Sequence, residues 1–247
     1  MLIVANWKAY VDDLAKAKKL FAIGKALARH AGCRIVLAPP APLLGALALK
    51  NKSGVAFAAQ DVSATTGGAH TGEVTAQAYA AAGAAYAIIG HSERRAVGDT
   101  SAIIALKLAH ALAHGLTPIL CVGEKERDGE GRYLATVREQ LTVAIESLAP
   151  KERTSVIIAY EPLWAIGKTA AAAIGPNDLT EMVLYIRKVL AEHLPGKSST
   201  RSLVLYGGAV EPENARALAA SCGIDGLLVG HASTDPRTFS LLVKQLS

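Results

Sequence analysis

The sequence has few cysteines and few aromatic residues. Of its 247 residues only 3 are Cys, and 5% are Phe, Trp or Tyr. Cys33, Cys121 and Cys222 stand singly, without a C-x-x-C spacing, which argues against a disulfide framework or a zinc site and suits a reducing compartment. With so few rings, the core must consist of Ala, Val, Leu and Ile, and a hydrophobic fraction of 51% is sufficient for a large one.

The sequence also lacks the patterns typical of membrane-spanning segments, signal peptides and nucleic-acid-binding tails. No stretch of about 18 strongly apolar residues occurs, and the apolar run at 2–5 is too short for a signal-peptide core, so we expect a cytoplasmic protein without membrane contact. The formal net charge of +5 favours an anionic partner. There is no basic tail, and Lys16–Arg29 has the spacing of a solvated helix face, so nucleic acid is only a weak alternative.

Short aliphatic runs alternate with longer amphipathic segments along the whole chain. The predicted strands are 2–6, 34–38, 55–60, 86–90, 116–121, 155–160, 202–206 and 225–229. The predicted helices are 12–30, 41–50, 73–82, 100–114, 132–148, 178–193, 212–221 and 236–245. Strict alternation predicts a parallel sheet with right-handed crossovers. Because eight such units fit about 250 residues, and no G-x-G-x-x-G follows the first strand, we predict one closed (β/α)8 barrel, a single domain spanning 1–247.

Polar side chains follow several of the predicted strands. In a closed parallel barrel the carboxyl ends of the strands surround one mouth, where active sites form. The residues in these positions are Asn6, Lys8, His91, Glu161, Gly207, Gly208, Ala209, Gly230 and His231. A carboxylate such as Glu161 can take a proton from one carbon and return it to its neighbour. The apolar segment 163–166 directly after it favours a water-poor site that raises its basicity.

Several segments carry a specific resemblance. They are N-W-K at 6–8, Q-D-V-S through T-G-E-V at 60–74, G-H-S-E-R-R at 90–95, Y-E-P-L-W-A-I-G at 160–167, Y-G-G at 206–208 and V-G-H-A-S at 229–233. In this order, and over essentially the whole chain, they resemble the triosephosphate isomerase family. The resemblance implies a TIM barrel that interconverts dihydroxyacetone phosphate and D-glyceraldehyde 3-phosphate through an enediolate, as a step of glycolysis and gluconeogenesis, without a metal or other cofactor.

The resemblance also implies roles for five residues. Glu161 is the base, and His91 is a neutral imidazole that donates a hydrogen bond to the substrate carbonyl; both roles are carried over from the family. Lys8 supplies a fixed positive charge for the substrate dianion and the enediolate, with Asn6 as its polar partner. Glu93 holds Lys8 in place.

The phosphate is expected at backbone N–H groups of Gly167, Ala209, Gly230 and His231, beside the last two strands. Three features depart from the family pattern: Lys168 directly follows Gly167 and an Ala-rich tract follows, Ala209 replaces a serine, and His231 replaces a glycine. We expect the backbone of His231 to adapt and its ring to lie near the phosphate, so that analogue affinity strengthens at lower pH. A ring turned to solvent is the equal alternative.

The resemblance implies a homodimer formed through a protruding loop at 61–74. Three alternatives stay open. The first is an isomerase for another short sugar phosphate, such as a tetrulose phosphate. The second is an inactive barrel that only binds a metabolite or a partner protein. The third is a phosphate-site aldolase or synthase, which is disfavoured because this sequence has no strand-end lysine in an evident Schiff-base pocket.

Overall fold

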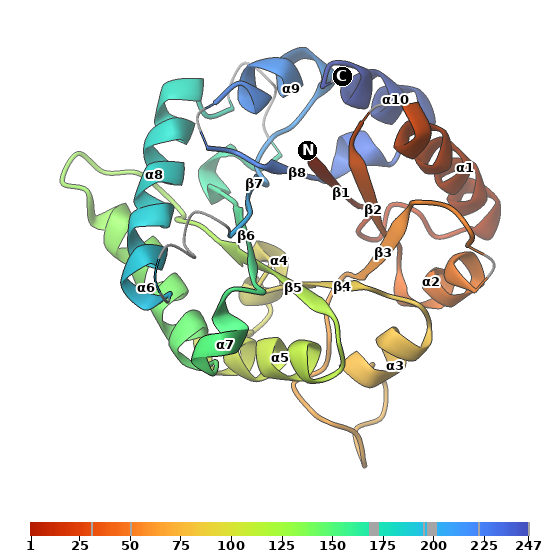
Figure 1. The fold of residues 1–247 in the computed structure, drawn as a ribbon, viewed down its shortest axis with the longest axis horizontal. Helices are drawn as coiled ribbons and strands as arrows, with labels where there is room; N and C mark the ends of the chain where they lie inside the picture. Colours follow the sequence, from red (N-terminus) through yellow and green to blue (C-terminus); the bar gives the residue numbers. More distant parts are fainter. Residues whose placement is uncertain are drawn as a thin grey trace.

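The fold is a closed eight-stranded parallel barrel surrounded by helices (Figure 1). The computed structural model describes residues 1–30, 32–49, 51–167, 173–194, 196, 202–221 and 223–246. The strands are β1 (Leu2–Asn6), β2 (Arg34–Ala38), β3 (Ala56–Ala59), β4 (Tyr86–Ile89), β5 (Thr117–Val122), β6 (Ile157–Tyr160), β7 (Val204–Tyr206) and β8 (Gly226–Val229). Each pairs in parallel with the next, and β8 pairs with β1, which makes the (β/α)8 barrel that the alternating pattern predicts.

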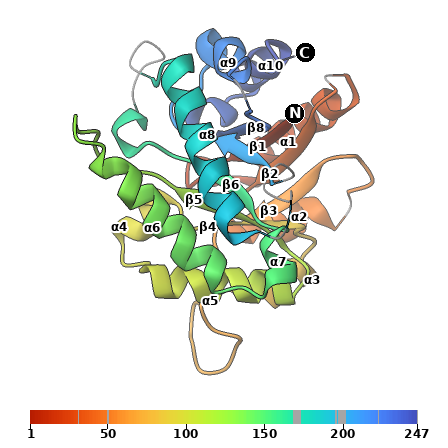
Figure 2. The same cartoon turned by 60° about the vertical axis from the view of Figure 1, so that its left-hand side comes forward.

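The helices surround the strands, most of them as an outer ring, whereas α4 (Ser92–Ala96) lies inside the outline of that ring in Figure 1 (Figures 1 and 2). They are α1 (Leu14–His30), α2 (Ala41–Ala48), α3 (Ala76–Ala81), α4 (Ser92–Ala96), α5 (Ser101–Ala113), α6 (Arg132–Glu146), α7 (Pro150–Arg153), α8 (Pro176–His193), α9 (Pro212–Ala219) and α10 (Pro236–Lys244). Two short 3-10 turns, η1 (Leu163–Ala165) and η4 (His231–Ser233), follow β6 and β8. None of the described helices is long and apolar enough to cross a membrane.

The core has two layers because alternate residues of each strand point to opposite faces. Twelve strand residues, among them Val4, Ile88 and Ile119, fill the barrel interior. The neighbouring strand residues pack outward against the helices, as Ile3 does against the larger cluster that includes Leu20 and Leu242. The strands are therefore buried on both faces, as their continuous aliphatic runs predict.

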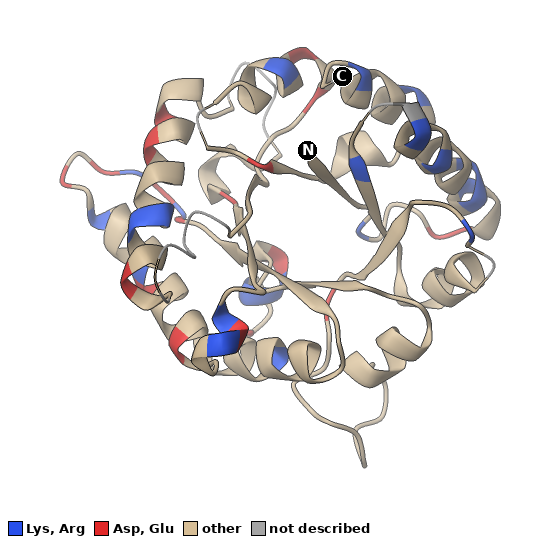
Figure 3. Ribbon diagram, viewed as in Figure 1, with Lys and Arg blue, Asp and Glu red and all other residues tan. Residues whose placement is uncertain are grey.

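Helix α1 carries many of the chain's basic residues on its outer face (Figure 3). Lys18, Lys19 and Arg29 are exposed, whereas Ala17 and Leu20 are buried against the barrel. This confirms the prediction that the basic stretch is a solvated helix face. The positive charge gathered there lies outside the barrel mouth.

The main errors of the sequence prediction are at helix ends. The helix predicted at 73–82 begins at Ala76, because the Thr75 side chain accepts a hydrogen bond from the Ala78 N–H and so caps the helix. The helix predicted at 178–193 begins two residues earlier, at Pro176, since proline is suited to the first helical position. The helix predicted at 132–148 ends at Glu146, and Pro150 starts a separate turn, α7.

The predicted strand bounds shift by two residues at most. The strands predicted at 155–160 and 202–206 begin at Ile157 and Val204, two residues late. The strand predicted at 116–121 runs from Thr117 to Val122. These differences leave every strand in its predicted order, so the residues expected at the carboxyl ends do lie there.

Candidate active site

All the residues proposed from the sequence line a single cavity of about 270 Å³ at the carboxyl ends of the strands. They are Asn6, Lys8, His91, Glu93, Glu161, Gly167, Ala209, Gly230 and His231. The chain thus brings together side chains separated by more than half its length. This is the mouth at which barrel enzymes build their active sites.

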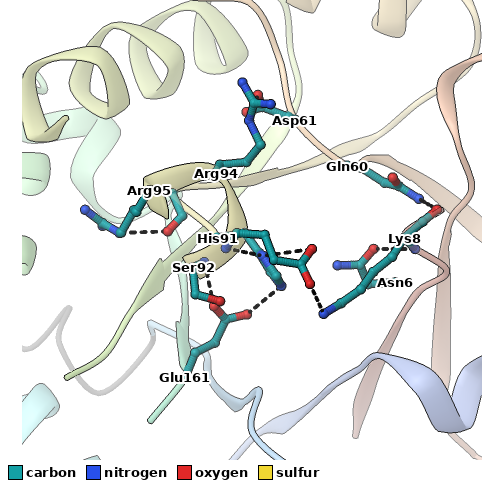
Figure 4. A network of polar contacts seen from close by, with 11 residues as sticks. Asn6, Lys8, Gln60, Asp61, His91, Ser92, Arg94, Arg95 and Glu161 are labelled. Atoms are coloured by element: carbon teal, nitrogen blue, oxygen red, sulfur yellow. Dashed lines mark hydrogen bonds and ion pairs between the residues drawn. The ribbon is translucent and has the colours of Figure 1, made fainter. Parts of the chain in front are cut away.

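Glu161 is a buried carboxylate at the carboxyl end of β6. Its backbone N–H donates to the Val122 carbonyl at 2.8 Å, and its side chain is 2% exposed. One oxygen, Oε2, accepts a hydrogen bond from the Ser92 N–H at 3.3 Å, whereas Oε1 lies 3.5 Å from His91 Nε2 (Figure 4). A carboxylate shielded from water in this way is well suited to accept a proton from carbon.

His91 precedes α4 and caps it. The ring Nδ1 accepts a hydrogen bond from the Glu93 N–H at 3.2 Å. Since a nitrogen that accepts a hydrogen bond carries no proton, the ring's proton belongs on Nε2, the nitrogen nearer Glu161. The geometry therefore fits an imidazole whose Nε2–H faces Glu161 in the cavity.

Lys8 extends from just beyond β1 into the cavity. Its Nζ lies 2.6 Å from Glu93 Oε1, and its backbone N–H donates to Asn6 Oδ1 at 3.0 Å (Figure 4). A Cβ at Gly230 would lie 3.5 Å from Lys8 Cε, so the lysine stem passes close to the end of β8. The lysine stem therefore lies in the cavity beside the end of β8, and Glu93 holds its ammonium group.

The Lys8 ammonium group affects the pKa of the Glu93 carboxyl. Burial acts to raise the pKa of the Glu93 carboxyl, but the hydrogen bond and positive charge of Lys8 outweigh it, so the pKa lies below its ordinary value. Glu93 is therefore ionised at neutral pH and keeps its attraction for Lys8. The contact is the one that the resemblance implies for Glu93.

The other end of the cavity consists of backbone from the ends of β6, β7 and β8. Gly167 has a φ of +70°, which glycine adopts without strain. At Gly207 a Cβ would lie 2.8 Å from Glu161 Cγ, so only glycine leaves room for the buried carboxylate in this position. Ala209 is 8% exposed, and its methyl side chain provides no hydroxyl donor at this end.

His231 lies at the start of η4 and has no strained backbone. Among the described residues Lys8 is the one non-glycine with a positive φ, so His231 has adapted in the way that we expected. Its ring packs edge-on against Tyr10 with centroids 5.6 Å apart. The residue lines the cavity but is largely exposed, so it occupies the rim.

The sequence did not predict two polar residues that line the cavity, Tyr10 and Glu211, nor the contact of Ser92 with Glu161; the apolar Val210 and Leu228 also line the cavity. Ser92 acts through its backbone N–H, for which a side chain gives no signal. Glu211 lies five residues beyond β7, and its position after the Gly207-Gly208 pair is the signal that could have drawn attention to it. Burial raises the pKa of the Glu211 carboxyl, and the nearby His231 opposes part of this shift.

The segment after Glu161 is anchored at its first turn. The side chain of Glu124, 1% exposed, accepts hydrogen bonds from Tyr160 Oη at 2.8 Å and from Trp164 Nε1 at 2.9 Å. The Leu163 N–H donates to the Glu124 carbonyl at 2.8 Å. The predicted change of the lid, Lys168 and the Ala-rich tract, falls mainly on 168–172, outside the described residues.

Cys121 lies inside the barrel and packs with the interior residues. Burial raises the pKa of its thiol well above the ordinary value. The thiol therefore stays protonated at neutral pH, which fits a packing role for this cysteine.

Together, the barrel and its mouth define an enzyme of the (β/α)8-barrel class, with a buried carboxylate, an imidazole and a lysine lining one cavity. The family model for triosephosphate isomerase matches residues 1–246. The chain therefore belongs to the triosephosphate isomerase family.

Similar curated proteins cover almost the full length. The triosephosphate isomerase of Symbiobacterium thermophilum is 38% identical over 244 residues, which are 98% of this chain and 94% of the relative. The enzyme of Halorhodospira halophila is 40% identical, with 96% and 94% covered. That of Thermus thermophilus is 38% identical, with 99% and 98% covered.

Proposed function

We propose that Glu161 moves a proton between the two adjacent carbons of a triose phosphate, with His91 and Lys8 stabilising the enediolate. The reaction is that of the family: interconversion of dihydroxyacetone phosphate and D-glyceraldehyde 3-phosphate. The observation that carries the proposal is the buried Glu161 carboxylate, 3.5 Å from the His91 ring in a cavity that also holds the Lys8 ammonium. The 247 residues act as one catalytic domain, and we propose a cytoplasmic location.

The reaction consists of two proton transfers at carbon, made by Glu161, and two at oxygen, made by His91. The Glu161 carboxylate removes a proton from the hydroxymethyl carbon of the ketose, and the electron pair moves onto the carbonyl oxygen to give an enediolate. His91 Nε2–H donates to that oxygen and recovers a proton from the neighbouring hydroxyl. The protonated Glu161 then returns its proton to the second carbon, which gives the aldose and restores the carboxylate.

The phosphate lies at the opposite end of the cavity in this proposal. The backbone N–H groups of Gly167, Ala209, Gly230 and His231 bind its oxygens, and the Lys8 ammonium offsets part of its charge. A group held mainly by backbone donors depends little on side-chain identity. The loss of the serine hydroxyl at Ala209 is therefore compatible with phosphate binding.

A substrate panel tests this function against its nearest alternative. Purified enzyme should give a far larger kcat/KM for the two triose phosphates than for tetrulose 4-phosphate or its aldose isomer. A larger kcat/KM for the tetrose phosphates would mean that the enzyme performs the same proton transfer on a longer substrate. If the protein binds inorganic phosphate but turns over none of these substrates, the result would instead favour an inactive barrel that only binds a metabolite or a partner protein.

The partner that we propose is a second copy of this chain, bound through the loop at 61–74. The loop projects from the barrel in both ribbon views, and every residue from 66 to 74 is exposed (Figures 1 and 2). Its ends are tied together by a hydrogen bond from the Ser63 N–H to the Val74 carbonyl at 2.9 Å. A cavity of about 510 Å³ beside Lys8 and Glu93, walled by Pro40, offers a place for this loop of the second copy.

We expect light scattering to give twice the 25.6 kDa mass of one chain. Shortening the loop between 66 and 73 should yield monomers with reduced kcat, because the cavity that it fills adjoins Lys8 and Glu93. A chain that is fully active as a monomer at all concentrations would contradict the proposed dimer.

Glu211 should make phosphate binding depend on pH. As pH falls through the raised pKa of Glu211, its carboxylate is neutralised and repulsion of the phosphate dianion is lost, so affinity should strengthen. Glu211→Gln should bind inorganic phosphate roughly twofold to fivefold more tightly at neutral pH, the size of a screened charge repulsion, with a flatter pH profile. Titration calorimetry, corrected for the ionisation of phosphate, measures both.

The same titration with His231→Gln separates the two groups at this rim. The other charged groups of the cavity and its rim stay in place in both variants: Lys8, Glu93, Glu161 and Glu213. If the pH dependence disappears only in His231→Gln, the histidine ring is the titrating group, as the sequence predicts. An unchanged profile in both variants would reject a role for either side chain.

A further inference from the structure

We propose that Gln60 is a positioning residue that holds the backbone of Lys8 in a left-handed conformation and so aims the ammonium group into the cavity. This inference rests on the role proposed above for Lys8. Gln60 directly follows β3, and its side chain points toward the chain segment beyond β1 (Figure 4). The Gln60 side chain hydrogen-bonds to backbone atoms of this segment, among them the Lys8 carbonyl.

The Gln60 side-chain amide connects three strand ends. Its Nε2 donates to the Lys8 carbonyl at 2.9 Å and to the Ala38 carbonyl, at the end of β2, also at 2.9 Å. The Ala38 carbonyl accepts a further hydrogen bond from the Trp7 N–H at 3.1 Å. The amide therefore uses both of its N–H donors on the backbone that carries and surrounds Lys8.

Lys8 needs such support because its conformation is unfavourable. Its φ is +47°, and a residue with a Cβ is less stable there than at negative φ. Asn6 Oδ1 accepts from the Lys8 N–H at 3.0 Å, while Gln60 donates to the Lys8 carbonyl. Both peptide groups flanking the strained residue are thus fixed by side chains, and Trp7 before it is fully buried.

The left-handed backbone conformation of Lys8 determines where its ammonium group lies. With the backbone held, the Lys8 side chain passes Gly230 and places Nζ 2.6 Å from Glu93 Oε1. Without the Gln60 amide, the segment can relax toward negative φ, which redirects the Cα–Cβ bond and moves the ammonium. A misplacement of about 1 Å at a catalytic group can lower the rate about 100-fold.

The test is a double-mutant cycle between Gln60→Met and Lys8→Met. Methionine keeps the length of glutamine but lacks both amide donors. We expect Gln60→Met to lower kcat/KM about 10- to 100-fold and to weaken the affinity for inorganic phosphate. In the Lys8→Met background the same change should have little further effect on either quantity, because Gln60 acts through Lys8.

Asn51→Leu is the matched control. The Asn51 Nδ2 donates to the Val55 carbonyl at 2.7 Å, so this variant also loses a side-chain amide bond to backbone, at the opposite end of β3. It should lower the thermal midpoint as Gln60→Met does but leave kcat and KM unchanged. Conversely, Gln60→Asn, which keeps an amide on a shorter stem, should recover part of the activity.

The outcomes distinguish this inference from the function on which it rests. If Gln60→Met reduces kcat/KM by the same factor with and without Lys8, Gln60 does not act through the lysine and the inference is overturned. Normal kinetics of the Gln60→Met enzyme would overturn it as well. If Lys8→Met itself keeps full activity, the proposed role of Lys8 fails first.

Discussion

Replacing Glu161 by glutamine should lower kcat by about 10²- to 10⁴-fold, the usual contribution of a positioned general base. Glutamine has nearly the same shape but cannot take a proton from carbon. The affinity for inorganic phosphate should change little, because the backbone donors at the far end of the cavity are untouched. A fall in kcat without a loss of binding is the pattern of an interaction used mainly in the transition state.

Steady-state kinetics with both triose phosphates measure kcat, and titration calorimetry measures the affinity for inorganic phosphate. Glu130→Gln makes the same chemical change at a side chain that is 72% exposed, and it should leave both quantities at the wild-type value. A Glu161→Gln enzyme with near-normal turnover would mean that another group is the base.

Replacing Lys8 by methionine should damage both catalysis and binding. The side chain is only 18% exposed, so its charge acts in a partly desolvated cavity on both the phosphate and the enediolate. We expect kcat to fall about 10²- to 10³-fold, the loss associated with a single preorganised electrostatic contact. Affinity for phosphate should fall roughly 10-fold or more, since a charge-assisted hydrogen bond is lost.

Lys18→Met on the exposed face of α1 is the control, because it changes the net charge equally without touching the site. If it reduced phosphate affinity as strongly as Lys8→Met, the long-range field of the protein would explain the effect. Lys8→Arg keeps the charge but has a bulkier, planar head, so it should restore binding better than turnover.

The sequence predicts the framework of the site because that framework depends on local patterns. Continuous aliphatic runs require strands buried on both faces, and their alternation with amphipathic segments leaves few topologies. Asn6, His91 and Glu161 each follow such a run, so their place at the barrel mouth follows from the topology. Helix ends are predicted less accurately, since one capping hydrogen bond, such as that of Thr75, moves the start by most of a turn.

Other features depend on contacts between distant segments. The φ of Lys8 and its support by Gln60 join positions 52 residues apart in the chain, and no local pattern predicts such a pair. Ser92 contributes a backbone N–H, for which the amino-acid type is uninformative. At His231 the expected adaptation of the backbone is observed, but the edge-on contact of its ring with Tyr10 has no local signal in the sequence.

One carboxylate, Glu161, carries the proton between the two carbons in the proposed reaction. Proton NMR in D2O tests this directly, because a proton held on a carboxyl group exchanges with solvent before it returns to carbon. The wild-type enzyme should place deuterium on the carbon-bound positions of the recovered substrate and of the product, and Glu161→Gln should lose this incorporation by about the factor it loses in kcat. Deuterium incorporation by Glu161→Gln at the wild-type rate would contradict the account.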